Sequence, residues 1–356
     1  MKHKRFFPRL TSLLCTLAMS LSLVPAVSAA SQPEPLISTN RYGYYNGNWA
    51  VPRSSYLYQD GQDLVRVEYR KGSQLVNGQT GQFLEWLTPT TLVVETYDSR
   101  FQLKETRELE VELPIWGGFF AGEDYNFVVF GQENPSESDS AEVVRVVKYS
   151  KSWERLDQAS LRGANTTIPF DAGGFTCAED GGLLYIRTSH EMYASSDGLN
   201  HQASLSFTVR QEDMTISDAA SAVSNPATGY VSHSFNQLML VDQEGRLVAL
   251  DHGDAYPRGA SLYRCDGQSG RRGTQLLVAS WPGSIGANVT GAQVTGLAET
   301  STGYLTAYSY TGKGASSNLT ADVKNIYLAY TSKDDFSQSG TRTRQITSYE
   351  IGRAHV

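Results

Sequence analysis

A weak repeat of strand-like segments constrains this fold more than any other feature of the sequence. Between residues 125 and 330, a short alternating apolar segment followed by polar residues recurs four times, and each copy precedes another apolar segment. A unit of this kind forms a small twisted sheet that cannot bury both faces alone, so neighbouring units stack. The predicted second strands of the units are 125–130, 183–187, 246–250 and 304–308; the predicted third strands are 143–149, 205–209, 260–264 and 325–330.

Repeats of this length predict an all-β fold, namely a β-propeller of four-stranded blades. Five blades are expected, at about 44–110, 114–162, 168–222, 228–268 and 290–340. Five is below the roughly six to eight blades that we expect in a closed ring, which indicates an incomplete ring. An incomplete ring leaves an edge strand exposed, so we expect the chain to be unstable or to associate. The alternative is a pair of β-sandwiches, which fits the strand spacing but not the repeat.

The first thirty residues have the pattern of a secretory signal peptide. A basic start with Lys2, Lys4, Arg5 and Arg9 precedes the uncharged, largely apolar run 13–24, and small residues follow near Ala29. This apolar run is too short for a transmembrane anchor. We therefore expect residues 1–30 to be removed, residues 31–43 to be a linker, and the protein to be secreted, extracellular or associated with the cell wall.

The last six residues, 351–356, resemble the translation of a sequencing adapter. We therefore expect the propeller to span residues 44–350 as a truncated fragment of a longer protein, and we assign no role to the tail.

Charge and cysteine content exclude several classes of function. The chain has 30 Lys and Arg against 37 Asp and Glu, and removal of residues 1–30 leaves a net charge of −11. An acidic exported protein is a poor partner for nucleic acid or an anionic membrane, and no transmembrane segment is expected. Cys177 and Cys265 would remain, and the sequence leaves open whether they form a disulfide or stay free.

Polar residues follow the predicted second strands, and in a propeller these positions gather at one end. We expect a ligand-binding site there. Three histidines are candidate ligands of a divalent metal, because imidazole suits transition-metal ions; the carboxylates are alternative acid/base groups for a glycan. Plain strand ends that meet solvent explain the same pattern. The ligand-binding candidates are Glu133, His190, Glu191, His252, Asp254, Tyr256 and Arg258; the metal candidates are His190, His233 and His252.

The sequence loosely resembles secreted bacterial β-propellers of the kelch or sialidase kind. Paired glycines at 117–118, 173–174 and 181–182 resemble the kelch Gly-Gly, and Ser195–His201 begins like the Asp-box of sialidase blades but lacks its Thr-Trp ending. The resemblance implies a propeller but does not choose between enzyme and binding module.

We therefore predict an exported protein that binds a ligand, a glycan or a cell-surface component, on one propeller face. The alternative is a metal- or carboxylate-dependent glycan hydrolase or lyase. The sequence contains no Gly-rich phosphate loop and no Ser nucleophile elbow, and it leaves open whether the protein is an enzyme.

Overall fold

A computed structural model describes residues 50, 52–76, 83–86, 88–220, 230–265, 273–312 and 323–349. The predicted signal peptide, the predicted linker and the predicted adapter tail lie outside the described residues. All described elements are strands, and no described helix is long and apolar enough to cross a bilayer.

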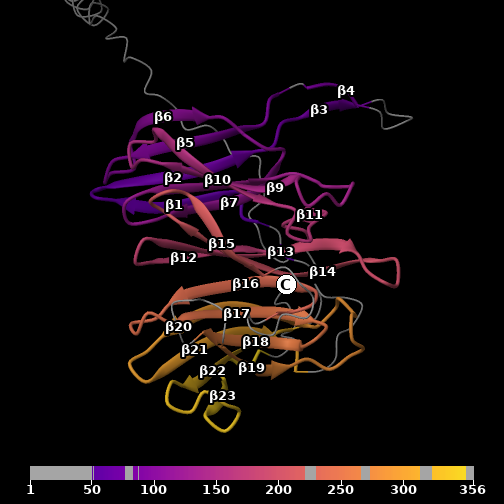
Figure 1. Cartoon of the computed structure of the whole chain (residues 1–356). Helices are drawn as coiled ribbons and strands as arrows, with labels where there is room; N and C mark the ends of the chain where they lie inside the picture. The colour runs from indigo at the N-terminus through magenta and orange to yellow at the C-terminus, as the bar shows by residue number, and fades with distance from the viewer. Residues whose placement is uncertain are drawn as a thin grey trace, which may run out of the picture.

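The described strands form five large sheets in chain order, each built around four antiparallel strands, and one separate two-stranded sheet (Figure 1). The first sheet has the order β1 (Ser55–Asp60), β2 (Asp63–Arg70), β5 (Thr91–Tyr97), β6 (Leu103–Leu109). The hairpin of β3 (Gln74–Val76) and β4 (Phe83–Trp86) projects from it. The second sheet consists of β7 (Ile115–Ala121), β8 (Asn126–Gly131), β9 (Glu142–Tyr149) and β10 (Arg155–Arg162).

The remaining three sheets repeat this plan. The third consists of β12 (Phe175–Asp180), β13 (Leu183–Ala194), β14 (Asn200–Arg210) and β15 (Thr215–Ala220), with the short β11 (Ile168–Pro169) also paired to β13. The fourth consists of β16 (Ser234–Val241), β17 (Leu247–Asp254), β18 (Arg258–Cys265) and β19 (Gly273–Ser280). The fifth consists of β20 (Ala292–Glu299), β21 (Gly303–Tyr310), β22 (Asn325–Ser332) and β23 (Thr341–Gln345).

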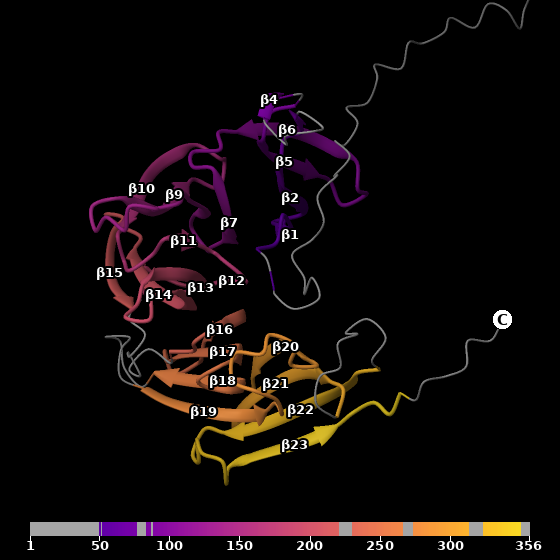
Figure 2. The same cartoon turned by 90° about the vertical axis from the view of Figure 1, so that its right-hand side faces the viewer.

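The five sheets are the blades of a β-propeller, which confirms the predicted fold class. Figure 2 shows the sheets arranged around a central axis, with the first strand of each sheet nearest the axis and the last strand outermost. The β-sandwich alternative is therefore wrong. The fourth blade was predicted to end at residue 268, but its outer strand β19 extends it to Ser280.

Apolar side chains from adjacent blades bury one another, because a strand directs alternate residues to opposite faces. Blades one and two share a cluster that includes Val67 and Trp116, blades two and three share one with Val129 and Ile186, and blades four and five share one with Leu250 and Tyr304. The interface between blades three and four is more polar. A small cluster around Tyr263 lies there beside a buried ion pair between Arg187 and Asp251.

The ring has an open sector between the first and fifth blades. In Figure 2 no strand of the described residues occupies this sector. Within the same residues, close strand contacts join blade two to three, three to four and four to five, and a shared apolar cluster joins blade one to two, whereas no cluster or comparable strand contact joins β20–β23 to the first blade. This arrangement agrees with the incomplete ring that the repeat predicts.

Cys177 and Cys265 form no disulfide with each other. Cys177 lies on the inner strand β12 and Cys265 is buried at the end of β18. The disulfide that the sequence left open is therefore not formed in this structure.

Candidate functional site

A central cavity of about 570 Å³ is enclosed by the innermost strands. All five inner strands, β1, β7, β12, β16 and β20, contribute lining side chains, and Ala50 and Arg53 precede β1 at its wall. The volume lies in the range of about 300–1,000 Å³ that small-molecule sites occupy. The cavity is thus the channel of the propeller and our candidate binding site.

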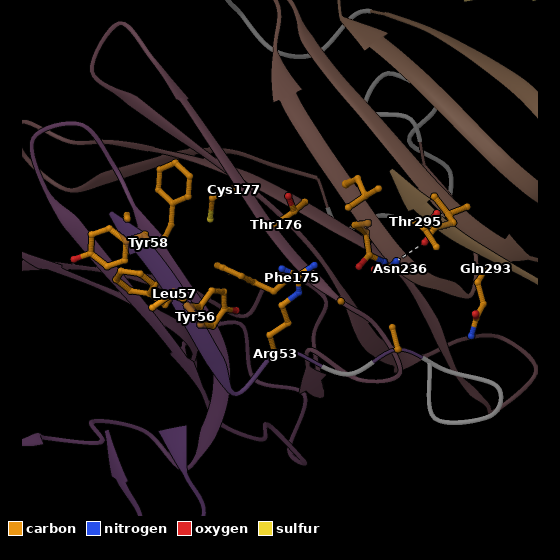
Figure 3. A pocket seen from close by; sticks show the side chains of 18 residues that line it. Arg53, Tyr56, Leu57, Tyr58, Phe175, Thr176, Cys177, Asn236, Gln293 and Thr295 are labelled. Carbon is orange, nitrogen blue, oxygen red and sulfur yellow. Dashed lines mark hydrogen bonds between the residues drawn. The ribbon is translucent and has the colours of Figure 1, made fainter. Parts of the chain in front are cut away.

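The two sides of the cavity differ in chemistry (Figure 3). Aromatic rings from blades one to three line one side, where Tyr56 packs edge-on against Phe119 at a centroid distance of 5.5 Å, and Phe175 lies nearby. Amide and hydroxyl side chains line the other side. The polar lining residues are Thr176, Asn236, Gln237, Gln293 and Thr295.

Arg53 is the one charged side chain among the described residues that line the channel. Its backbone carbonyl accepts a hydrogen bond of 2.6 Å from the Trp116 indole nitrogen, which fixes the main chain at this point. Within the described part of the chain, its guanidinium has neither a hydrogen-bond partner nor an ion-pair partner. Figure 3 shows this side chain extending into the space between the aromatic and polar sides.

An unsatisfied acceptor lies in the same wall. Gln237 is 1% exposed, and its amide nitrogen donates to Ser234 Oγ at 2.6 Å, whereas its Oε1 has no hydrogen-bond partner. This oxygen is buried from the cavity as well as from solvent, so it is an energetic cost to the fold and does not by itself mark a ligand contact. The Asn236 amide instead donates to the Val294 carbonyl at 2.9 Å, which links the inner strands of blades four and five.

The residues predicted from the sequence lie outside this channel. The second strands β13 and β17 are longer than predicted, so His190, Glu191, His252 and Asp254 lie within strands rather than beyond strand ends. Because these strands lie second from the axis, their side chains point into interfaces between blades. None of the seven predicted ligand-binding residues lines the described cavity.

His190 and His252 are buried structural groups. Nδ1 of His190 lies 2.6 Å from Thr166 Oγ1, and Nε2 of His252 lies 2.8 Å from Thr290 Oγ1. Burial lowers the pKa of each histidine to about 3, so both are neutral at physiological pH.

The three metal candidates do not form one group. His252 lies among the residues between blades four and five, close to Phe235 and Trp281, whereas His233 precedes β16 and contacts Asp254. Among the described residues no cluster of three or more His, Cys, Asp or Glu side chains is arranged to hold a metal ion. The physical reason is that the three histidines lie on different segments: His190 is on β13 of blade three, His252 is on β17 of blade four, and His233 precedes β16.

The other candidates have varied surroundings. Glu133 is exposed, and Glu191 accepts a hydrogen bond of 3.0 Å from Thr167 Oγ1. Tyr256 is 70% exposed. The Arg258 guanidinium donates to the carbonyls of Pro282, Ala287 and Val289 and so anchors the loop before β20. Burial lowers the pKa of Arg258.

Sequence reasoning missed the channel residues. Gln237 and Asn236 lie in an ordinary alternating strand, and Arg53 lies in the predicted first blade, in which no inner strand was assigned. The sequence did offer one signal for these residues. In a propeller the first strand of each unit lies at the axis, so the side chains of these strands were candidates for the channel lining.

The chain resembles known proteins at the level of structure. No protein-family model and no curated protein sequence matches the chain. Similar solved structures include an ACO/RPE65 chimera, with a TM-score of 0.43 and 11% identity over 83% of this chain and 61% of that chain. A protein of unknown function from Dyadobacter fermentans has a TM-score of 0.40 and 10% identity over 86% and 85% of the two chains.

A third similar structure is an α-L-arabinanase from Cellvibrio cellulosa complexed with arabinohexaose, with a TM-score of 0.32 and 11% identity over 63% and 75% of the two chains. At these identities the likeness concerns the fold alone. The present chain spans 61% of the length of the ACO/RPE65 chimera. The finer kelch-like or sialidase-like assignment stays a prediction.

Proposed function

We propose that the protein is an exported binding protein whose channel holds an acidic glycan, with the carboxylate of a uronic acid against Arg53. The observation that carries this proposal is the unpaired guanidinium of Arg53, the one charge among the described lining residues. Arginine binds carboxylates through two parallel hydrogen bonds, which makes it suited to this role.

The rest of the lining fits a sugar ring. Aromatic faces such as Tyr56 and Phe175 present apolar surface to ring C–H groups, and the amides of Gln237 and Gln293 bind hydroxyls.

The residue types in the described channel lining favour binding over hydrolysis. Glycoside hydrolysis commonly uses two carboxyl groups that flank the scissile bond, separated by about 5–9.5 Å. The described channel lining contains neither Asp nor Glu. The predicted alternative, a carboxylate-dependent glycan hydrolase, therefore has no acid/base pair among these residues.

Calorimetric titration with a short oligogalacturonate, compared with a neutral oligogalactan of the same length, tests the proposal. Arg53→Ala should weaken oligogalacturonate binding about 10- to 100-fold, since a hydrogen bond to a charged group contributes about 1.5–3 kcal/mol. Arg100→Ala, which removes an exposed arginine in the turn before β6, is the matched control and should bind normally.

Two results would overturn the proposal. If the acidic and neutral saccharides bind equally well and Arg53→Ala has no effect, the proposal of an acidic ligand is wrong. Release of new reducing ends from the oligogalacturonate by the protein would show catalysis instead of binding. Export is tested separately, by sequencing the N-terminus of the protein recovered outside the cells; a start near residue 30 or 31 is expected.

A further inference from the structure

Two histidines, each paired with an aspartate, lie together where blade three meets blade four. Nε2 of His201 on β14 lies 2.9 Å from Asp197 Oδ2, and Nδ1 of His233 lies 3.0 Å from Asp254 Oδ1. The two rings have a centroid distance of 6.3 Å and an interplanar angle of 25°. Of these four residues, His233 and Asp254 are candidates from the sequence, where they were grouped with His190 and His252, whereas His201 and Asp197 are not.

The backbone holds the two histidines in place. The His233 amide donates to the Gln202 carbonyl at 2.8 Å, and the Ser204 amide donates to the Val231 carbonyl at 2.9 Å. The segment before β16 is thereby attached to β14 as a short extra strand. His233 itself has a φ of 52°, a left-handed conformation that is uncommon for a residue with a side chain.

Asp254 is a buried carboxylate that contacts His233. Its side chain has no exposed surface, and neither oxygen has a partner in hydrogen-bond geometry, although His233 Nδ1 lies at ion-pair distance from Oδ1. A buried carboxylate is costly unless an opposing charge or donor compensates it. A cation bound at the far side of the His233 ring supplies such compensation through the imidazole.

We propose that His201 and His233 bind one divalent transition-metal ion of the imidazole-preferring class, such as Zn²⁺ or Cu²⁺. In metal sites a ligating imidazole usually donates its other N–H to a carboxylate, which fixes the tautomer and makes the free nitrogen more basic. His201 has this arrangement with Asp197, whereas His233 Nδ1 is only at ion-pair distance from Asp254 Oδ1. The nitrogens left for a metal are His201 Nδ1 and His233 Nε2.

The ring separation permits a shared ion. With metal–nitrogen bonds of about 2.0–2.1 Å, each ring centroid lies about 3.1–3.2 Å from the metal, so two rings on one ion are at most about 6.4 Å apart. The observed 6.3 Å is within this limit. Opposite positions of a square-planar ion need no change in separation but need both rings to turn their free nitrogens towards the ion, and a tetrahedral ion also needs the rings to approach by about 1 Å.

The proposed metal site is open to solvent, as expected for an ion that keeps water among its ligands. The His201 and His233 side chains are 35% and 25% exposed, so an ion reaches them from solvent. Two protein ligands leave the remaining positions to water, consistent with the lack of a cluster of three or more candidate ligands in the described residues. The ion would join blade three to blade four.

The test is calorimetric titration of the untagged full chain with ZnCl₂ and CuCl₂, in a parent in which His3 and His355 are replaced by alanine. Those two histidines lie outside the described residues. The parent should bind one ion, with a rise in Tm. His201→Ala and His233→Ala should each weaken binding at least about tenfold and remove that rise, and Asp197→Asn should weaken binding about 10- to 100-fold, as for other outer-shell carboxylates.

Asp213→Asn is the matched control, because Asp213 is a similarly exposed acid paired with Arg210 at 2.8 Å. It should leave affinity unchanged. Nitrogen hyperfine structure from two imidazoles in the Cu²⁺ paramagnetic resonance spectrum is expected for the parent, and from one imidazole in either alanine variant. Failure of the parent to bind either ion at millimolar concentration overturns the proposal, as does an affinity equal to the parent's in both histidine variants.

Discussion

The Arg187 guanidinium and the Asp251 carboxylate form a bidentate ion pair across the interface between blades three and four. Nε donates to Oδ1 at 2.8 Å and Nη2 donates to Oδ2 at 2.6 Å, with both side chains almost fully buried. Ser206 Oγ accepts a third bond from Arg187, and Ser234 Oγ donates to Asp251. This network is the polar centre of an interface whose apolar cluster is small.

Removing one partner of this ion pair should be strongly destabilising. Asp251→Ala leaves the Arg187 charge buried without its carboxylate, so the free energy of unfolding should fall by about 3–5 kcal/mol. The double variant Arg187→Met, Asp251→Leu should recover most of that loss, because two apolar groups of similar volume need no partner. Urea unfolding of the three proteins measures the difference. A double variant less stable than Asp251→Ala would contradict this account.

The two buried histidines should make the protein sensitive to mild acid. The folded-state pKa of each is about 3, below the unfolded value of about 6.5. Their contribution to stability is therefore fully present above pH 6.5 and is lost as the pH falls towards 3. Each histidine lowers the free energy of unfolding by about 1.4 kcal/mol per pH unit in this window.

Substitutions that keep each histidine's hydrogen bond but remove its titratable imidazole test this prediction. Asn places its amide nitrogen near the position of Nδ1, and Gln places it near Nε2, so His190→Asn and His252→Gln preserve the contacts to Thr166 and Thr290. Each should remove about one proton from the uptake on unfolding between pH 6 and 4. Urea midpoints measured across this range would show it. An unchanged pH slope in both variants would contradict the burial of neutral imidazoles.

A negative charge placed in the channel should oppose an acidic ligand. Thr295 is an exposed lining residue of β20, so Thr295→Glu brings a carboxylate into the cavity at little cost in stability. Oligogalacturonate binding should weaken by about tenfold at low salt, and added salt should reduce the difference. Thr302→Glu, in the turn between β20 and β21, is the control and should bind normally. Stronger binding of the acidic saccharide to Thr295→Glu would contradict the role of Arg53.

The glycine pair in β7 should tolerate no side chain at its first position. A Cβ on Gly117 would lie 2.4 Å from the Phe170 ring, between blades two and three. Gly117→Ala should therefore lower the free energy of unfolding by about 1–3 kcal/mol. Combining it with Phe170→Leu should restore part of the loss relative to Phe170→Leu alone. Thermal unfolding compares the four proteins, and additive effects of the two substitutions would show that the contact does not matter.

The repeat predicted the blades well because strand alternation and turns are local. The segment at 143–149 is β9, and the segment at 304–308 lies within β21. The outer strand β19 was missed because Gly273–Ser280 lacks a counterpart among the segments that defined the repeat.

The predicted site residues could not be placed from local pattern alone. Which face of β13 carries His190 depends on the register with β12 and β14, and a change of one residue reverses it. The sequence also brought His233 into a metal group but not His201, its neighbour in space. Their proximity depends on the pairing of Ala203 with Ser232, which joins segments of two different blades.

Because all five blades line the channel, binding of a ligand there would depend on all five blades being packed together. Each inner strand supplies part of the wall, so a saccharide that filled the proposed site would contact all five blades. Its binding free energy is then available only to molecules in which every blade is docked, and it stabilises that state by mass action. The ligand would thus hold the blades together, and saturating the site with ligand would favour molecules in which all five blades are packed over those in which an end blade has detached.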